Sequence, residues 1–204
     1  MTQKQQLDHV YDVAAGAPMR HFYDDWATAY DTDLEQHGYR TPARCAEALK
    51  RHVADLKTPI LDFACGTGLS GQALATAGFE CIDGIDLSQQ MLSEAAKKNV
   101  YRKLRVCEPS NPFDATDRYS VITAVGAIGA GAAPIACLSQ AIEHLAPGGV
   151  LCVSLNDHSL AEKEYENIIK DSEREGLVNI LEDEYGEHLP SIGLRAKVYV
   201  LRRR

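Results

Sequence analysis

Residues 60–71, which read ILDFACGTGLSG, constrain the fold of this chain more than any other segment. The segment begins as a short apolar run after Pro59, passes through glycines, and leads into residues 72–78 with the spacing and terminal glycine of a helix. It therefore predicts a buried strand, a tight loop and a helix. The pattern Gly66-x-Gly68-x-x-Gly71 also matches the dinucleotide-binding fingerprint, so we expect a nucleotide-like ligand at this loop.

Two carboxylates narrow the choice of ligand. Asp62 lies on the predicted strand just before the loop, and Asp86 lies twenty residues beyond Gly66 at the end of the next apolar run. A carboxylate at position 62 repels a pyrophosphate but attracts an ammonium group, directly or through water. The two oxygens of Asp86 suit the two adjacent hydroxyls of a ribose. These features favour S-adenosylmethionine over NAD, and an NAD-dependent oxidoreductase is kept as a remote alternative.

Three motifs then carry a family resemblance. DFACGTG at 62–68, GIDLS at 84–88 and LAPGG at 145–149, in this order and spacing, resemble the class I S-adenosylmethionine-dependent methyltransferases. The segments 23–31 and 38–42 are similar to those of small-molecule-type members that resemble the Williams-Beuren region methyltransferase-like proteins. The resemblance covers about residues 20 to 204. It departs from the commonest pattern at the first loop glycine, which is Ala64 here, a small change for a tight loop.

Alternation of apolar runs and helical patterns predicts an α/β fold, a Rossmann-like doubly wound sheet that is mostly parallel. Strands are expected at 59–64, 79–85, 103–107, 119–125 and 149–155, and helices at 69–77, 88–97 and 134–146. After a helix at 159–175, two further strands are expected at 177–184 and 194–201. Such a closing antiparallel pair is what the resemblance implies, and it gives an antiparallel C-terminal strand.

The N-terminal part is expected to lie outside this sheet. Residues 1–204 are read as a single methyltransferase domain, with an N-terminal arm and lid helices over 1–56 and the Rossmann-like core over 57–204. A short helix is expected near 7–14 and another from Thr41 to Leu56. From Met19 onward, aromatic residues share one helix face, which indicates core packing, a lid over the ligand, or both.

The loop geometry and the resemblance together give a set of candidate cofactor-binding residues. Leu87 and Met91 are placed to sandwich the adenine, although the helical spacing of Met91 also suits the core. Cys107 stands near the position where the family commonly has an aspartate, and Glu108 is the alternative with a shift of one residue. The full set is Trp26, Tyr30, Asp62, Ala64, Cys65, Gly66, Gly68, Leu69, Asp86, Leu87, Met91, Cys107, Glu108 and Val125.

The chemistry itself leaves the catalytic residues open. Methyl transfer is an in-line displacement at an activated sulfonium, so alignment can supply much of the rate and a base is not obligatory. Polar side chains that the pattern puts near the mouth of the site are weak candidates for a base, namely His21, Tyr23, Tyr30 and Asn156, with Asp157 and His158 beside them. Small residues at 124–129 indicate a roomy cavity or one walled by the lid helix.

Composition limits the partners. With 21 basic and 29 acidic residues the net charge is −8, which disfavours nucleic acid and anionic membranes. The six cysteines are scattered without metal or disulfide spacing, and no apolar run is long enough to cross a bilayer. We therefore expect a cytoplasmic methyltransferase that acts on a small molecule, without a metal. A non-catalytic S-adenosylmethionine-binding partner or sensor is the alternative, and the oligomeric state is open.

Overall fold

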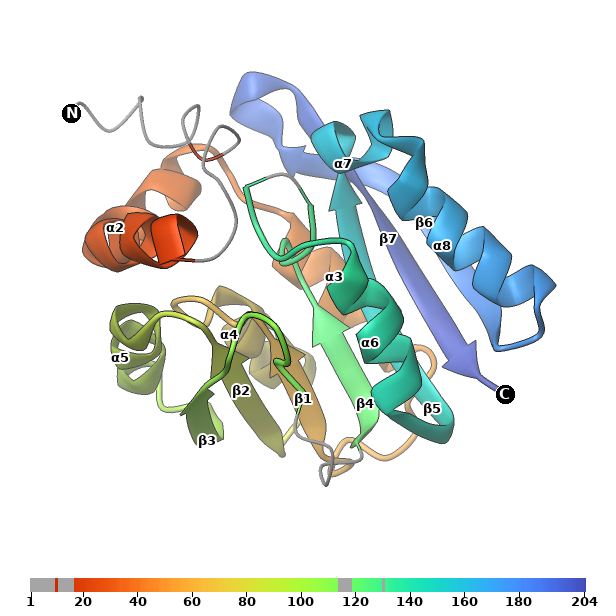
Figure 1. Ribbon diagram of the computed structural model, residues 1–204. Coiled ribbons are helices and arrows are strands. Elements are labelled where there is room, and N and C mark those ends of the chain that lie inside the picture. The colour runs from red at the N-terminus through yellow and green to blue at the C-terminus, as the bar shows by residue number, and fades with distance from the viewer. Residues whose placement is uncertain (1–9, 11–16, 114–118, 130) are drawn as a thin grey trace.

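The computed structural model describes residue 10 and residues 17–113, 119–129 and 131–204, so the helix expected near 7–14 lies, apart from residue 10, outside the described residues. Seven strands form one sheet in the order β3-β2-β1-β4-β5-β7-β6 (Figure 1). The first five are parallel, and β7 runs antiparallel to both of its neighbours. The strands are β1 Ile60–Phe63, β2 Ile82–Asp86, β3 Tyr101–Val106, β4 Tyr119–Ala124, β5 Leu145–Asn156, β6 Val178–Leu189 and β7 Leu194–Arg203. The predicted Rossmann-like fold, with its closing antiparallel pair, is confirmed.

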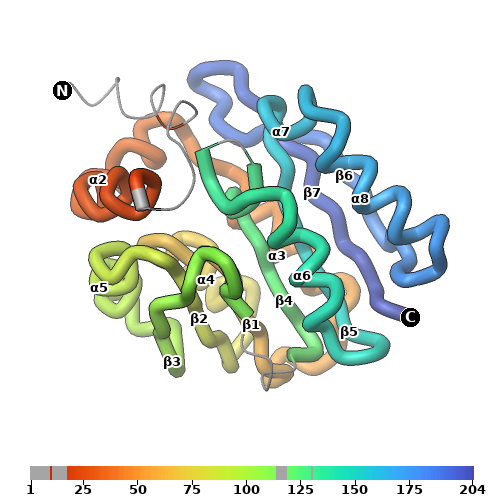
Figure 2. The backbone as a smooth tube through the Cα atoms, viewed as in Figure 1, coloured from red at the N-terminus to blue at the C-terminus, as the bar shows by residue number. Residues whose placement is uncertain are grey.

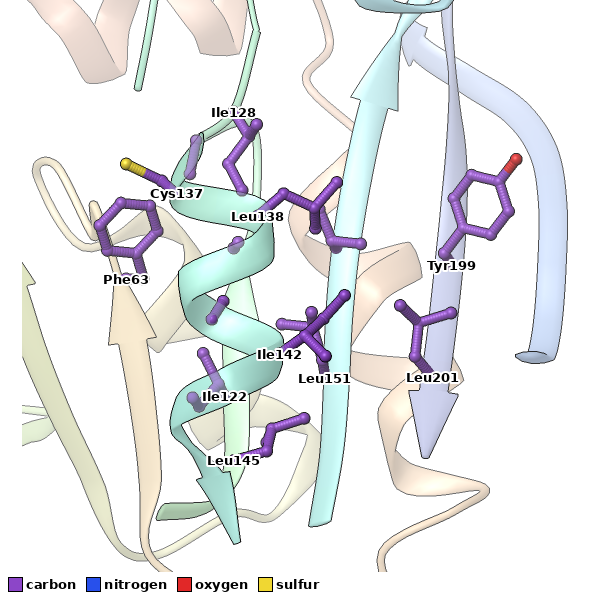
Figure 3. Packing of buried hydrophobic residues seen from close by; sticks show 14 of the residues in the cluster. Phe63, Ile122, Ile128, Cys137, Leu138, Ile142, Leu145, Leu151, Tyr199 and Leu201 are labelled. Carbon is purple, nitrogen blue, oxygen red and sulfur yellow. The ribbon is translucent and has the colours of Figure 1, made fainter. Parts of the chain in front are cut away.

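Helices cover both faces of the sheet, as apolar residues on both sides of the central strands require. The described helices are α2 Ala17–Gln36, α3 Thr41–Lys50, α4 Leu69–Ala77, α5 Gln89–Lys97, α6 Ala136–His144, α7 Asp157–Ala161 and α8 Lys163–Arg174, with a short 3-10 turn at Pro190–Ile192. On one face, Leu138 and Ile142 of α6 pack against Ile122 and Leu151 (Figure 3). On the other, α3 and α4 pack against β1, β2, β5 and β7.

The helix α3 ends earlier than predicted. It stops at Lys50, whereas apolar spacing predicted a helix through Leu56. Val53 is nonetheless buried in the core formed by α3 and α4, and Leu56 packs against that core. The apolar spacing therefore indicated that these side chains pack against the core. The backbone that carries them forms turns and not a helix.

Two other boundaries differ from the prediction because capping groups intervene. The helix expected at 159–175 is divided into α7 and α8 at Glu162, which is extended (φ −90°, ψ 96°). The side chain of Asn156 caps α7 by accepting from the Ser159 amide, so that helix also begins earlier. Strand β2 begins at Ile82 instead of residue 79, because the amide of Phe79 donates to Leu74 at the end of α4.

The helix α2 lies outside the sheet, beside α5 (Figures 1 and 2). Its carboxylates attach it to the core on two sides. Asp31 accepts from the Thr67 hydroxyl of the glycine loop at 2.5 Å and pairs with Lys98. Asp24 accepts from the hydroxyl of Ser88, the residue before α5, at 2.5 Å. These contacts hold α2 over the glycine loop and over the turn that follows β2.

Candidate functional site

The loop that joins β1 to α4 has an unusual backbone. Ala64, Gly66 and Gly68 have positive φ angles of 51°, 54° and 89°. For Ala64 this left-handed conformation costs roughly 1–2 kcal/mol, since only glycine adopts it freely. A side chain built on Gly66 would meet nothing within 4 Å, so the loop faces open space there. The chain therefore turns sharply and directs its backbone toward a cavity.

Asp62 anchors this loop from beneath. Its side chain is buried, with 0% exposure, and accepts three hydroxyl hydrogen bonds: from Ser70 at 2.6 Å, from Tyr101 at 2.7 Å and from Thr123 at 2.9 Å. Burial raises the pKa of Asp62, and the three donors oppose that shift. The amide of Gly71 donates to the Tyr101 hydroxyl at 3.1 Å, so the same network also fixes the first turn of α4.

The sequence predicted that Asp62 attracts an ammonium group, directly or through water, and that contact stays a prediction. Both oxygens of Asp62 point at protein hydroxyls, and the residue does not line the cavity. The side chain positions the loop.

The Tyr101 ring also explains the third glycine of the fingerprint. A Cβ on Gly71 would lie 2.3 Å from the ring of Tyr101, and one on Gly68 would lie 2.9 Å from it. At Gly84 of β2 the distance would be 3.0 Å. These glycines leave space for the Tyr101 ring, whose hydroxyl bonds to Asp62. Their spacing is therefore required to support the loop and not only to admit a ligand.

Asp86 ends β2 and does line the cavity. Its Oδ2 accepts from the Gly66 amide and its Oδ1 from the Ser88 amide, both at 2.9 Å. Burial raises the pKa of Asp86 to about 6, because desolvation outweighs the backbone donors. Each carboxylate oxygen can accept further hydrogen bonds. The two oxygens of Asp86 are therefore held in place as hydrogen-bond acceptors beside the backbone of the glycine loop.

The cavity holds about 950 Å³ of empty space, part of which is open to solvent. It lies between the glycine loop, the end of β2, α2 and the segment after β4. Eleven of the residues singled out by sequence line it: Tyr23, Tyr30, Ala64, Cys65, Gly66, Leu69, Asp86, Leu87, Met91, Cys107 and Val125. Sequence reasoning missed the lining residues Met19, Tyr39, Thr67 and Cys137, which reach the cavity from four separate segments.

Seven predicted residues besides Asp62 do not line this cavity, among them Asp157 and His158 of α7. Trp26 is buried, and its Nε1 donates to Asp33 at 2.7 Å. Asn156 caps α7, and both it and Trp26 line a neighbouring cavity. Gly68 lies under the Tyr101 ring. His21 and Glu108 are exposed and line neither cavity.

The lining is suited to an adenosine joined to an amino acid. The first-turn amides of Leu69 and Ser70 have no hydrogen-bond partner among the described residues, and both residues line the cavity. Such amides at a helix N-terminus bind a carboxylate. Asp86 suits a ribose diol, and the apolar side chains of Leu87 and Met91 suit an adenine. Within the described part of the chain, no group of histidine, cysteine and acidic residues could hold a metal ion, and no helix could span a membrane.

Comparison with known proteins defines the class. Residues 36–196 match a family described as a methyltransferase domain. The chain belongs to this family of class I methyltransferases, whose methyl donor is S-adenosylmethionine. It is 32% identical over 149 residues to methyltransferase-like protein 27 of Homo sapiens, which covers 68% of this chain and 58% of that protein.

A further relative and a solved structure resemble the chain. The chain is 29% identical over 147 residues to dTDP-3-amino-3,6-dideoxy-alpha-D-glucopyranose N,N-dimethyltransferase of Streptomyces fradiae, covering 69% of this chain and 56% of that enzyme. The glycopeptide N-methyltransferase MtfA, solved with S-adenosyl-L-methionine, shares the fold with a TM-score of 0.56 at 14% identity over 79% of this chain and 94% of that one. The chain thus spans 58% and 56% of the length of the two curated relatives.

Proposed function

We propose that this chain transfers the methyl group of S-adenosylmethionine to a small-molecule acceptor. One observation carries the proposal: the carboxylate of Asp86 and the open amides of Leu69 and Ser70 line a single cavity beside the glycine loop. The cofactor needs these partners, an acceptor for its ribose and donors for its carboxylate.

We assign roles within the cavity as follows. Asp86 accepts hydrogen bonds from the ribose hydroxyls, and Leu87 and Met91 hold the adenine. The amides of Leu69 and Ser70 hold the carboxylate of the methionine part, and the backbone of Cys65 and Gly66 lies against it. Asp62 acts indirectly by fixing the loop through Ser70 and Tyr101.

The cofactor supplies a methyl group on a positively charged sulfur. With both reactants bound, the methyl group would pass from sulfur to the acceptor atom, the electron pair of the broken bond would stay on S-adenosylhomocysteine, and the acceptor would release its proton to solvent. The chain aligns the two reactants, and alignment of this kind can supply most of the acceleration.

A small acceptor is favoured by charge and by enclosure. The net charge of −8 opposes a phosphate backbone. A second cavity adjoins the first and is also covered by α2, so the approach from that side suits a compact molecule. The relative from Streptomyces fradiae is named for an amino-sugar nucleotide substrate, which agrees with a small acceptor.

The test combines binding and turnover. The purified chain is titrated with S-adenosylhomocysteine and then incubated with S-adenosylmethionine and a panel of phenols, amines, thiols, carboxylates and a model RNA. We expect S-adenosylhomocysteine to bind and to be released with at least one small acceptor. Turnover on the RNA alone would contradict the small-molecule assignment, and binding without any turnover would favour a sensor.

A further inference from the structure

A second cavity adjoins the cofactor cavity and holds about 590 Å³ of empty space, part of it open to solvent. The two cavities share Tyr23, Tyr30, Tyr39, Gly126 and Ala132 in their linings. The two cavities therefore meet at these residues, and a ligand in the second cavity would lie next to the first. The second cavity has no assigned occupant.

The passage between the cavities is shaped by the end of β4. Gly126 follows this strand with a φ of 62°, and a Cβ there would lie 2.5 Å from the Tyr39 hydroxyl. Its amide donates to the Ser154 hydroxyl at 2.7 Å, which fixes its position. A glycine at this position therefore lets the Tyr39 hydroxyl come to the strand end, where the small residues of the sequence indicated a roomy cavity or one walled by the lid helix.

One wall of the second cavity is aromatic. Tyr23, Trp26 and Tyr30 lie on one face of α2, and the rings of Trp26 and Tyr30 meet edge to face at 4.7 Å. The indole nitrogen is already bonded to Asp33, so the ring itself is what Trp26 offers the cavity. A wall of this kind favours a flat apolar ligand, which packs against aromatic rings.

The described residues that line the second cavity include no acidic or basic side chain other than His188. Burial lowers the pKa of His188 to about 4, and Asp157 and Arg44 act on it with opposite signs from outside the lining. The imidazole is therefore neutral at pH 7. An ionised ligand would lose its water here and meet no opposite charge, which is unfavourable.

Two polar side chains of the lining, His188 and Asn156, can each form a hydrogen bond to a ligand. Nδ1 of His188 lies 2.7 Å from the Thr41 hydroxyl, and none of the described residues bonds its Nε2. The side-chain oxygen of Asn156 accepts from the Ser159 amide at 3.0 Å, so its nitrogen is left as a donor. The cavity thus combines an aromatic wall with neutral hydrogen-bonding groups.

We propose that this second cavity is the methyl-acceptor site and that it takes a compact, uncharged aromatic molecule whose polar group hydrogen-bonds to His188. The inference rests on the proposed function, because the cofactor must occupy the adjoining cavity. The acceptor lies with its ring against α2 and its nucleophilic atom at the passage beside Tyr39 and Gly126. His188 contacts the acceptor. Because its imidazole carries no charge, the cavity favours an uncharged molecule over an ion.

Three matched probes test this selection: 4-hydroxybenzyl alcohol, 4-hydroxybenzoate and 4-hydroxybenzylamine, which share a ring and differ in charge. Their binding to the protein loaded with S-adenosylhomocysteine is measured by calorimetry and by ligand-observed NMR. We expect the alcohol to bind at least about tenfold more tightly than either ion. Equal or tighter binding of the carboxylate or the ammonium probe would overturn the inference.

Variants locate the binding. Ile128→Trp fills the second cavity and should abolish binding of the alcohol, while His188→Glu should shift the preference toward the ammonium probe. His52→Gln is the matched control, since His52 lies beyond the opposite end of α3, pairs with Glu182 and lines neither cavity. Alcohol binding that survives Ile128→Trp refutes the site. A wild-type chain that binds S-adenosylhomocysteine but not the alcohol refutes only this inference, whereas a wild-type chain that binds no S-adenosylhomocysteine refutes the proposed function itself.

Discussion

Replacing Tyr101 with phenylalanine is expected to destabilise the protein by about 2–3 kcal/mol. The change removes the hydroxyl that donates to Asp62 at 2.7 Å and accepts from the Gly71 amide at 3.1 Å. A hydrogen bond to a charged, buried group contributes about 1.5–3 kcal/mol, and leaving the Gly71 amide without its acceptor adds about 1 kcal/mol. Asp62 keeps two donors, Ser70 and Thr123, so the two losses do not add in full.

Urea unfolding at pH 7 measures this loss, and thermal unfolding should show a decrease of roughly 5–10 °C. Tyr119→Phe is the matched control. Its hydroxyl donates to Asp83 at 3.0 Å, but Arg102, whose side chain is 41% exposed, makes two bonds to the same buried carboxylate and keeps its charge paired, so we expect a loss below about 1 kcal/mol. A loss for Tyr101→Phe no larger than that of Tyr119→Phe would refute the view that this network supports the loop.

Three further predictions follow from single contacts. Affinity for S-adenosylhomocysteine should fall about tenfold in calorimetry between pH 8 and pH 5, because Asp86, with its pKa raised to about 6, becomes protonated and loses the charge that holds the ribose; a flat profile would contradict this role. Gly126→Ala, with its Cβ 2.5 Å from the Tyr39 hydroxyl, should lower turnover at least about tenfold while cofactor affinity stays within about twofold, and unchanged kcat would count against the passage. Glu166→Gln should cost about 1–2 kcal/mol in urea unfolding at pH 7, since Tyr199 and Lys197 lower the pKa of Glu166 to about 2. That contribution is present above about pH 4.5 and is lost as the pH falls through about 2, so the difference from wild type should narrow in acid, and a constant difference would contradict it.

The sequence predicted the order of strands and helices because each pattern is local. The run before Gly66 is buried on both sides, and the helix that follows ends at a glycine in the left-handed conformation, Gly78. The predicted ends of helices were wrong where a capping group or a single extended residue ends the helix. Glu162 divides the helix after β5, and nothing in the apolar spacing of 159–175 marks that break.

The candidate site was partly visible in the sequence because the glycine loop and Asp86 belong to short motifs. Tyr101 was missed because it reaches Asp62 from 39 residues away across β2. His188 was missed for the same reason, since it joins Thr41 from 147 residues away. The supporting role of Asp62 was missed because the hydroxyls of Ser70, Tyr101 and Thr123 come together around it only in the folded chain, and no local sequence pattern shows this.

Calorimetric titration of S-adenosylhomocysteine into the wild-type chain, Asp86→Asn and Asp83→Asn tests the cofactor site most directly. Both aspartates lie on β2, but Asp83 bonds to Arg102 and Tyr119 away from the cavity. We predict one binding site in the wild type, a loss of about 10- to 100-fold in affinity for Asp86→Asn, and affinity within about twofold of wild type for Asp83→Asn. Equal affinities for wild type and Asp86→Asn would contradict the assignment of this cavity to the methyl donor.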